Sequence, residues 1–217
     1  MKVINLSEQN SLLNRFVSEL RNVEIQNDRL RFRRNVERIG EVMAYEISKT
    51  LNYKEHKIQT PLGVANESLD EDDVVIATIL RAGLPFHHGF GNYFDRAGNA
   101  FVSAYRKYKD RLNFDIHIEY IASPSLAETT LILSDPMLAT GGSMELAYRA
   151  LLTKGQPKIL HFSSIIASQP AIDYLKERLP EDSTLWVAAI DPEIDDHSYI
   201  IPGLGDAGDL AFGEKLD

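Results

Sequence analysis

Over the first 50 residues, apolar side chains recur at helical spacing and predict two helices. In the first helix, which Ser7 can cap, they are Leu12, Leu13, Phe16, Val17 and Leu20. In the second, capped by Asn27 or Asp28, they are Phe32, Val36, Ile39, Met43 and Ile47. The other face of the second helix carries Arg29, Arg31, Arg33, Arg34 and Arg38. We interpret this basic run as a solvated or partner-facing surface, with a phosphate or effector site as the alternative.

From residue 74 onward, apolar runs alternate with helical patterns. Val74–Leu80 (VVIATIL) is apolar and β-branched, as expected of a strand that is covered on both faces. We predict further strands at 100–105, 131–133, 158–167 and 184–190, and helices at 84–94, 144–152 and 170–179. A turn at Thr60–Gly63 is predicted to join two short strands. This order predicts an α/β fold, with a mainly parallel central sheet flanked by helices.

One segment breaks the alternation. Between residues 114 and 120, apolar and polar side chains switch with period two, which indicates a strand with one solvated face. We interpret residues 106–123 as a projecting β-arm and a candidate dimer element. Without a linker or repeat, residues 1–217 are predicted to form one domain, with helices over 1–50 and a C-terminal loop region over 191–217.

Composition narrows the function. The net charge of −9 argues against a nucleic-acid partner, which would need a basic surface. Cysteine is absent, so neither disulfides nor thiolate metal sites are expected. The sequence has no apolar run long enough for a membrane span and no secretory pattern at its start, so we expect a cytoplasmic location. An anionic substrate would need donors concentrated locally, because long-range repulsion opposes its binding.

The segment Asp135–Ser143 (DPMLATGGS) joins a predicted strand to a predicted helix. Ligands of parallel sheets bind at the carboxyl ends of strands, and a helix start offers free amides and a favourable dipole to a phosphate. The glycines let the backbone approach the anion, while Asp135 suits sugar hydroxyls or a hydrated metal. Without a lysine after the glycines this is not a Walker loop. The alternative is an ordinary tight turn.

Two further segments follow predicted strands. The turn Arg81-Ala82-Gly83 offers backbone amides and a guanidinium, which suit a diphosphate. The segment Tyr199–Asp209 is rich in glycine and proline, which indicates a defined loop; a poorly ordered tail is the alternative.

Histidines and aspartates near these segments are possible metal ligands. Adjacent His87 and His88 would point to different faces of a helix, so packing or surface roles are favoured over metal binding. Asp191, Asp195 and Asp196 could attract a cation, but solvated loop charges are favoured.

Taken together, DPMLATGGS after an apolar strand resembles the phosphoribosyl diphosphate (PRPP) signature of type I phosphoribosyltransferases, in the form of the uracil phosphoribosyltransferase family. The turn at Arg81 is similar to the diphosphate loop of that family. The Tyr199–Asp209 loop resembles its uracil-binding loop. These matches occur in the order of the family.

The resemblance implies roles for individual residues. PRPP would be bound by Arg81, Ala82, Gly83, Arg106, Asp135, Pro136, Met137, Leu138, Ala139, Thr140, Gly141, Gly142, Ser143 and Asp206. Uracil would be bound by Tyr199, Ile200, Gly205, Asp206 and Ala207. Of these, Arg81, Arg106, Asp135 and Asp206 would act in catalysis. The cofactor would be Mg²⁺, held mainly by PRPP oxygens and reached by Asp206 through water.

The implied reaction converts uracil and PRPP to UMP and diphosphate, in a homodimer or higher homo-oligomer. A purine or orotate acceptor is one alternative, disfavoured because a purine site would usually offer an aromatic residue for stacking. A regulatory protein that senses PRPP or UMP and binds RNA is another, disfavoured by the acidic charge.

Overall fold

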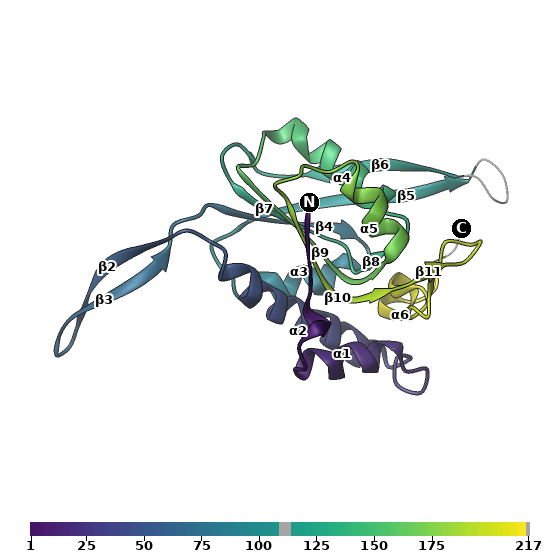
Figure 1. The fold of residues 1–217 in the computed structure, drawn as a ribbon, viewed down its shortest axis with the longest axis horizontal. Coiled ribbons are helices and arrows are strands. Elements are labelled where there is room, and N and C mark those ends of the chain that lie inside the picture. The colour runs from purple at the N-terminus through teal and green to yellow at the C-terminus, as the bar shows by residue number, and fades with distance from the viewer. Residues whose placement is uncertain (109–113, 216–217) are drawn as a thin grey trace.

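The computed structural model describes the backbone of residues 1–108 and 114–215, and the side chains of these residues outside 104–118. Its centre is a twisted sheet (Figure 1). In spatial order the strands are β1 (Lys2–Asn5), β10 (Thr184–Asp191), β9 (Ile159–Ser168), β7 (Thr130–Ser134), β4 (Val74–Leu80), β5 (Gly98–Tyr108) and β6 (Phe114–Ala122). The short β8 (Met137–Leu138) also pairs with β9. All these pairs are parallel except β5–β6, which confirms the predicted mainly parallel α/β sheet.

Helices cover both faces of this sheet. One face packs against α1 (Leu12–Arg21), α2 (Arg29–Ser48) and α3 (Gly83–Gly91), and the other against α4 (Gly142–Leu151) and α5 (Gln169–Lys176) (Figure 1). Successive strand residues face opposite clusters: Ile132 belongs to the first, and Leu131 and Leu133 to the second. This double burial explains why the strands read as continuous apolar runs.

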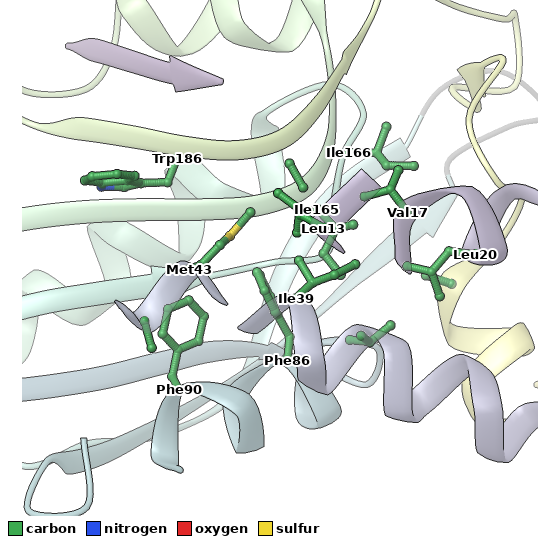
Figure 2. Close-up of a cluster of buried hydrophobic side chains, with 14 of the residues drawn as sticks. Leu13, Val17, Leu20, Ile39, Met43, Phe86, Phe90, Ile165, Ile166 and Trp186 are labelled. Carbon is green, nitrogen blue, oxygen red and sulfur yellow. The ribbon is translucent and has the colours of Figure 1, made fainter. Parts of the chain in front are cut away.

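The cluster beneath α1, α2 and α3 shows how the predicted helical stripes are used. Ile39 and Met43 of α2 are fully buried, and they meet Phe86 and Phe90 of α3 and Trp186 of the sheet (Figure 2). The predicted apolar stripes of both N-terminal helices are therefore confirmed as core positions, except for the exposed Leu12 and the half-buried Phe16.

The N-terminus differs from the prediction at two points. Lys2–Asn5 forms an edge strand, β1, followed by a single 3-10 turn, η1 (Leu6–Glu8). Ser11, and not Ser7, caps α1, because its side chain accepts the amide of Leu13 in a capping box. The second helix begins after Asp28, which confirms one of the two predicted caps.

The predicted turn at Thr60–Gly63 is confirmed, and it closes a hairpin longer than expected. Strands β2 (Tyr53–Thr60) and β3 (Gly63–Asp70) pair with each other in a separate antiparallel sheet. In Figure 1 this hairpin extends away from the central sheet. Pairing of β5 with β6 likewise supports the hairpin predicted over 106–123, although residues 109–113 lie outside the described chain.

Buried histidines serve packing. The His87 ring packs against Phe101 in a tilted arrangement, with 4.9 Å between ring centroids, and its Nε2 lies 2.6 Å from the Asn99 Oδ1. His88 is exposed, so the favoured interpretation of this pair is confirmed. In the core, Trp186 donates its indole N–H to Nδ1 of His161 at 3.2 Å. Burial lowers the pKa of His161 to about 4, so it is neutral at pH 7.

Candidate active site

The predicted loops gather at one edge of the sheet because their strands are parallel neighbours. Thr78 of β4 pairs in register with Ser134 of β7, so the turn at Arg81 and the loop at Asp135 leave the sheet side by side. Two buried hydroxyls tie the strand ends together. Thr78 Oγ1 donates to the Ser134 carbonyl at 3.3 Å, and Ser134 Oγ donates to the Ala77 carbonyl at 3.1 Å. These bonds fix the spacing between the two loops.

The Thr140–Ser143 turn opens α4 in the way an anion site requires. Gly141 is the N-cap residue with a φ of +83°, and no described side chain caps the first amides of the helix. A Cβ at Gly141 would lie 2.9 Å from Cδ1 of Tyr174 on α5, so a side chain there would meet both backbone strain and a clash. The first-turn amides of α4 remain available to a phosphate.

Strand β9 holds the rest of this loop. The Pro136 carbonyl accepts the amides of Ile165 and Ile166, each at 3.1 Å. Ser168 Oγ donates to the Ala139 carbonyl at 2.7 Å. At the strand end, Asp135 Oδ1 accepts the Met137 amide at 3.3 Å. An ordinary tight turn would not need so many anchors, and here they preorganise the loop before any ligand arrives.

Glu145, a carboxylate in the first turn of α4, was not predicted from the sequence to lie at the site. Burial would raise its pKa, but hydrogen bonds from Tyr174 (2.6 Å) and Arg149 (2.8 Å) outweigh that effect and hold the pKa below its usual value. Arg178 lies 3.9 Å away. The negative charge beside the candidate phosphate site is therefore compensated by neighbouring cations.

The turn after β4 meets the C-terminal loop. Arg81 Nη2 lies 3.0 Å from Asp209 Oδ1, although 128 positions separate the two residues. Asp206 caps α6 (Ala207–Phe212), since its Oδ1 accepts the Asp209 amide at 2.9 Å. A Cβ on Gly208 would lie 3.1 Å from that oxygen and 3.5 Å from Arg81 Nη2. The guanidinium and two carboxylates thus form one cluster. Asp209 was not predicted to take part; its position three residues after Asp206 was the only signal.

Packing excludes a poorly ordered tail for the loop at Tyr199–Asp209. Its β12 (Ile200–Ile201) pairs with β11 (Glu193–Ile194), and Ile200, Leu204 and Ala207 are buried. Gly205 has a φ of +95°. The loop borders a cavity of ≈ 360 Å³ that is also lined by Gln26, Arg29, Leu210 and Glu214.

Asp191 is neither a solvated loop charge nor a candidate metal ligand, which corrects the sequence interpretation. It is 5% exposed and forms a bidentate pair with Arg21 at 2.8 Å for both contacts. Asp195 instead organises its turn by accepting the amides of His197 and Tyr199. Among the described residues, no group of three or more histidine, cysteine, aspartate or glutamate side chains could hold a metal ion.

Three arginines of α2 form ion pairs or hydrogen bonds with other residues of this chain. Arg31 pairs with Glu19 and Arg34 with Glu37. Arg33 donates to the Ala211 carbonyl at 2.6 Å. These contacts agree with the favoured interpretation of a surface rather than an effector site. Arg106 belongs to β5 by its backbone, but its side chain lies outside the described part of the chain.

A larger cavity of ≈ 690 Å³ lies away from these loops. It is lined by Asp70–Val74 and Tyr93–Ala97, at the amino end of β4. Ligands of parallel sheets bind at the carboxyl ends, so this cavity is not part of the candidate site. None of the helices in the described ranges is long and apolar enough to cross a membrane.

The sheet and the helices on its two faces have the fold of type I phosphoribosyltransferases. A hypoxanthine phosphoribosyltransferase from Staphylococcus aureus shares the fold, with a TM-score of 0.51 over 86% of this chain and 84% of that one, at 12% identity. A protein of Aquifex aeolicus is more similar in structure, with a TM-score of 0.87, 27% identity, and coverage of 99% of this chain and 100% of that one.

Sequence relatives narrow the class. The family model described as uracil phosphoribosyltransferase matches residues 7–214, and the chain belongs to that family. A uracil phosphoribosyltransferase from Porphyromonas gingivalis is 70% identical over 216 residues, covering 100% of both chains. Another, from Methanothermobacter thermautotrophicus, is 40% identical over 86% of this chain and 85% of its own length.

Proposed function

We propose that this chain transfers the 5-phosphoribosyl group of PRPP to N1 of uracil, giving UMP and diphosphate. Besides family membership, one observation carries the proposal. Arg81, which follows β4, meets the Asp206–Asp209 segment of the C-terminal loop, next to the strand end that leads into Asp135–Ser143. Donors for the two ends of PRPP and a loop for the base therefore lie along one edge of the sheet.

Each part of PRPP has a matching group. The amides and hydroxyls of Thr140–Ser143 anchor the 5-phosphate, and the Asp135 carboxylate orients the ribose hydroxyls. Arg81, the amides of Ala82 and Gly83, and Arg106 neutralise the leaving diphosphate. The remaining loop residues, Pro136–Ala139, line the PRPP site between the Asp135 carboxylate and the Thr140–Ser143 amides.

Asp206 and Asp209 fit the chemistry of a magnesium site that is completed by the substrate. Carboxylate oxygens are donors that Mg²⁺ prefers, and it commonly keeps several waters and binds substrate phosphates. When bound, Mg²⁺ would neutralise charge on the diphosphate. Asp206 would reach it through water, and Arg81 holds Asp209 beside this position.

Uracil is recognised by main-chain groups of a fixed loop. Backbone donors and acceptors at Ile200, Gly205 and Ala207 match the edge of the pyrimidine, with Tyr199 beside them. A rigid donor–acceptor pattern of this kind discriminates against cytosine, whose edge presents a different pattern. No general base is needed, because the N1–H of uracil is already acidic and the transfer centre develops positive charge as the diphosphate leaves.

We also place the enzyme in the cytoplasm as a homodimer, and the β2–β3 hairpin supports the dimer. An isolated two-stranded hairpin is only marginally stable in water. Exposed apolar side chains on such a hairpin therefore indicate that another protein surface packs against it. Leu62 at its tip is 100% exposed and Val64 62% exposed. This hairpin joins the 106–123 arm as a candidate dimer element.

The dimer is tested by replacing Leu62 and Val64 together with aspartate. We expect the double variant to sediment as a monomer at a concentration where the unchanged chain is dimeric, because two charges oppose burial of the hairpin. Leu12→Asp, at a 71% exposed position on α1, is the matched control and should leave the dimer intact. A double variant with unchanged sedimentation would exclude the hairpin from the interface.

Activity is tested with labelled uracil and PRPP, with and without Mg²⁺, and with cytosine, orotate and hypoxanthine in parallel. We expect a nucleotide product only with uracil, which gives UMP, and only with Mg²⁺ present. Turnover with another base but not with uracil would contradict the proposed acceptor. Specific RNA binding without turnover would favour the regulatory alternative.

A further inference from the structure

Gly203, in the proposed uracil loop, is held at both its N–H and its C=O by a partly buried ion pair from outside the loop. Arg21, the last residue of α1, donates through Nη1 to the Gly203 carbonyl at 2.9 Å. Asp191, the last residue of β10, accepts the Gly203 amide at 2.9 Å. The same two side chains pair with each other bidentately at 2.8 Å. One ion pair thus fixes both the N–H and the C=O of a single loop residue.

Gln26 holds the next residue along the loop. Its amide nitrogen donates to the Leu204 carbonyl at 2.9 Å and to the Leu20 carbonyl at 2.8 Å. Gln26 also lines the ≈ 360 Å³ cavity beside Gly205 and Asp206. The connection between α1 and α2 therefore reaches the loop directly.

The held residues lie in the middle of the proposed base site. Gly203 and Leu204 lie between Ile200 and Gly205, and the turn is tight: a Cβ on Gly203 would lie 2.1 Å from the Ile200 carbonyl oxygen. Because the chain is so compact here, a shift at Gly203 must move Ile200 or Gly205. Recognition by main-chain groups depends on this geometry, since no flexible side chain can compensate for a displaced amide.

We infer that Arg21, Asp191 and Gln26 are positioning residues that set the uracil-binding geometry of the 200–207 loop without touching uracil. This inference rests on the proposed function, because it concerns the base site of that reaction. It gives the N-terminal helices a role in substrate selection. Donors at the phosphate end, Thr140–Ser143, share none of these contacts and are unaffected.

Gln26→Leu and Arg21→Ala test the inference through steady-state kinetics with both substrates. We expect each to raise KM for uracil about tenfold, as the loss of a hydrogen bond that fixes a binding group allows. KM for PRPP should change by less than about twofold, because its anchors lie elsewhere. Arg21→Ala leaves the buried Asp191 carboxylate without its ion-pair partner, so this variant could fail to fold. Gln26→Leu removes no charge and tests the inference on its own.

Arg31→Ala is the matched control. Arg31 also forms a bidentate pair, with Glu19, and ties α1 to α2, but none of its contacts within the described part of the chain reaches the 200–207 loop. Its removal should lower thermal stability while leaving KM for uracil unchanged. If Arg21 and Gln26 had a merely structural role, all three variants would show lower thermal stability and an unchanged KM for uracil.

Two results would overturn the inference. One is an unchanged KM for uracil in folded Gln26→Leu; the other is an equal rise in KM for uracil and PRPP. Both presuppose that the unchanged chain forms UMP. If it does not, the proposed function fails, which is a separate outcome from failure of the positioning role.

Discussion

Asp206→Asn is expected to lower kcat for UMP formation on the order of 100-fold, as the loss of one electrostatic contact to a reacting group does. Asparagine caps a helix as well as aspartate, so the bond from the Asp209 amide and the start of α6 should survive. Only the negative charge beside Arg81 and the diphosphate is removed. Steady-state kinetics at saturating PRPP and Mg²⁺ measure the effect.

Asp206→Ala separates the two roles of this side chain. It removes both the cap and the charge, so it should lose at least as much activity as Asp206→Asn and also melt at a lower temperature. Turnover near that of the unchanged chain in Asp206→Asn would show that the carboxylate does not engage the PRPP complex.

Gly141→Ala is expected to raise KM for PRPP by more than about tenfold, while KM for uracil changes little. An alanine at a φ of +83° costs about 1–2 kcal/mol. Its Cβ would also lie 2.9 Å from Cδ1 of Tyr174 and 3.1 Å from Cγ of Leu175. The phosphate loop must move to relieve this contact, and the amides of α4 move with it.

Gly91→Ala is the control for this change. Gly91 has no positive φ, and an added Cβ would meet only Ile76 Cδ1, at 3.9 Å. Its kinetics should match those of the unchanged chain. If Gly141→Ala retained the original KM for PRPP, the 5-phosphate would not be held by the start of α4.

The sequence was enough to predict the sheet because its strands are covered on both faces. Val74–Leu80 is apolar throughout for that reason, and it was predicted at the bounds that the structure has. Strand β1 was missed because it has only four residues at the sheet edge, too few to show a period. The exposed β2–β3 hairpin was predicted as a turn between two short strands but not at its full length, since its polar strands bury little.

The site residues that could be predicted from the sequence lie in loops that follow predicted strands. Asp135, Gly141 and Arg81 could be proposed because each lies in a loop after an apolar run, where parallel sheets bind ligands. Arg21 and Asp191 could not be proposed from the sequence, because they are 170 positions apart and meet only after α1 packs beside β10. Asp191 was misinterpreted for the same reason: a partner 170 positions away leaves no local signal in the sequence.

The most direct test of the account is a crystal structure of this protein with bound UMP. We expect the 5′-phosphate at the amides of Thr140–Ser143, the ribose hydroxyls at Asp135, and the pyrimidine edge against the backbone of Ile200, Gly205 and Ala207. The Arg21–Asp191 pair should still hold Gly203. A phosphate bound away from the start of α4, or a pyrimidine that does not touch the 200–207 loop, would contradict the account.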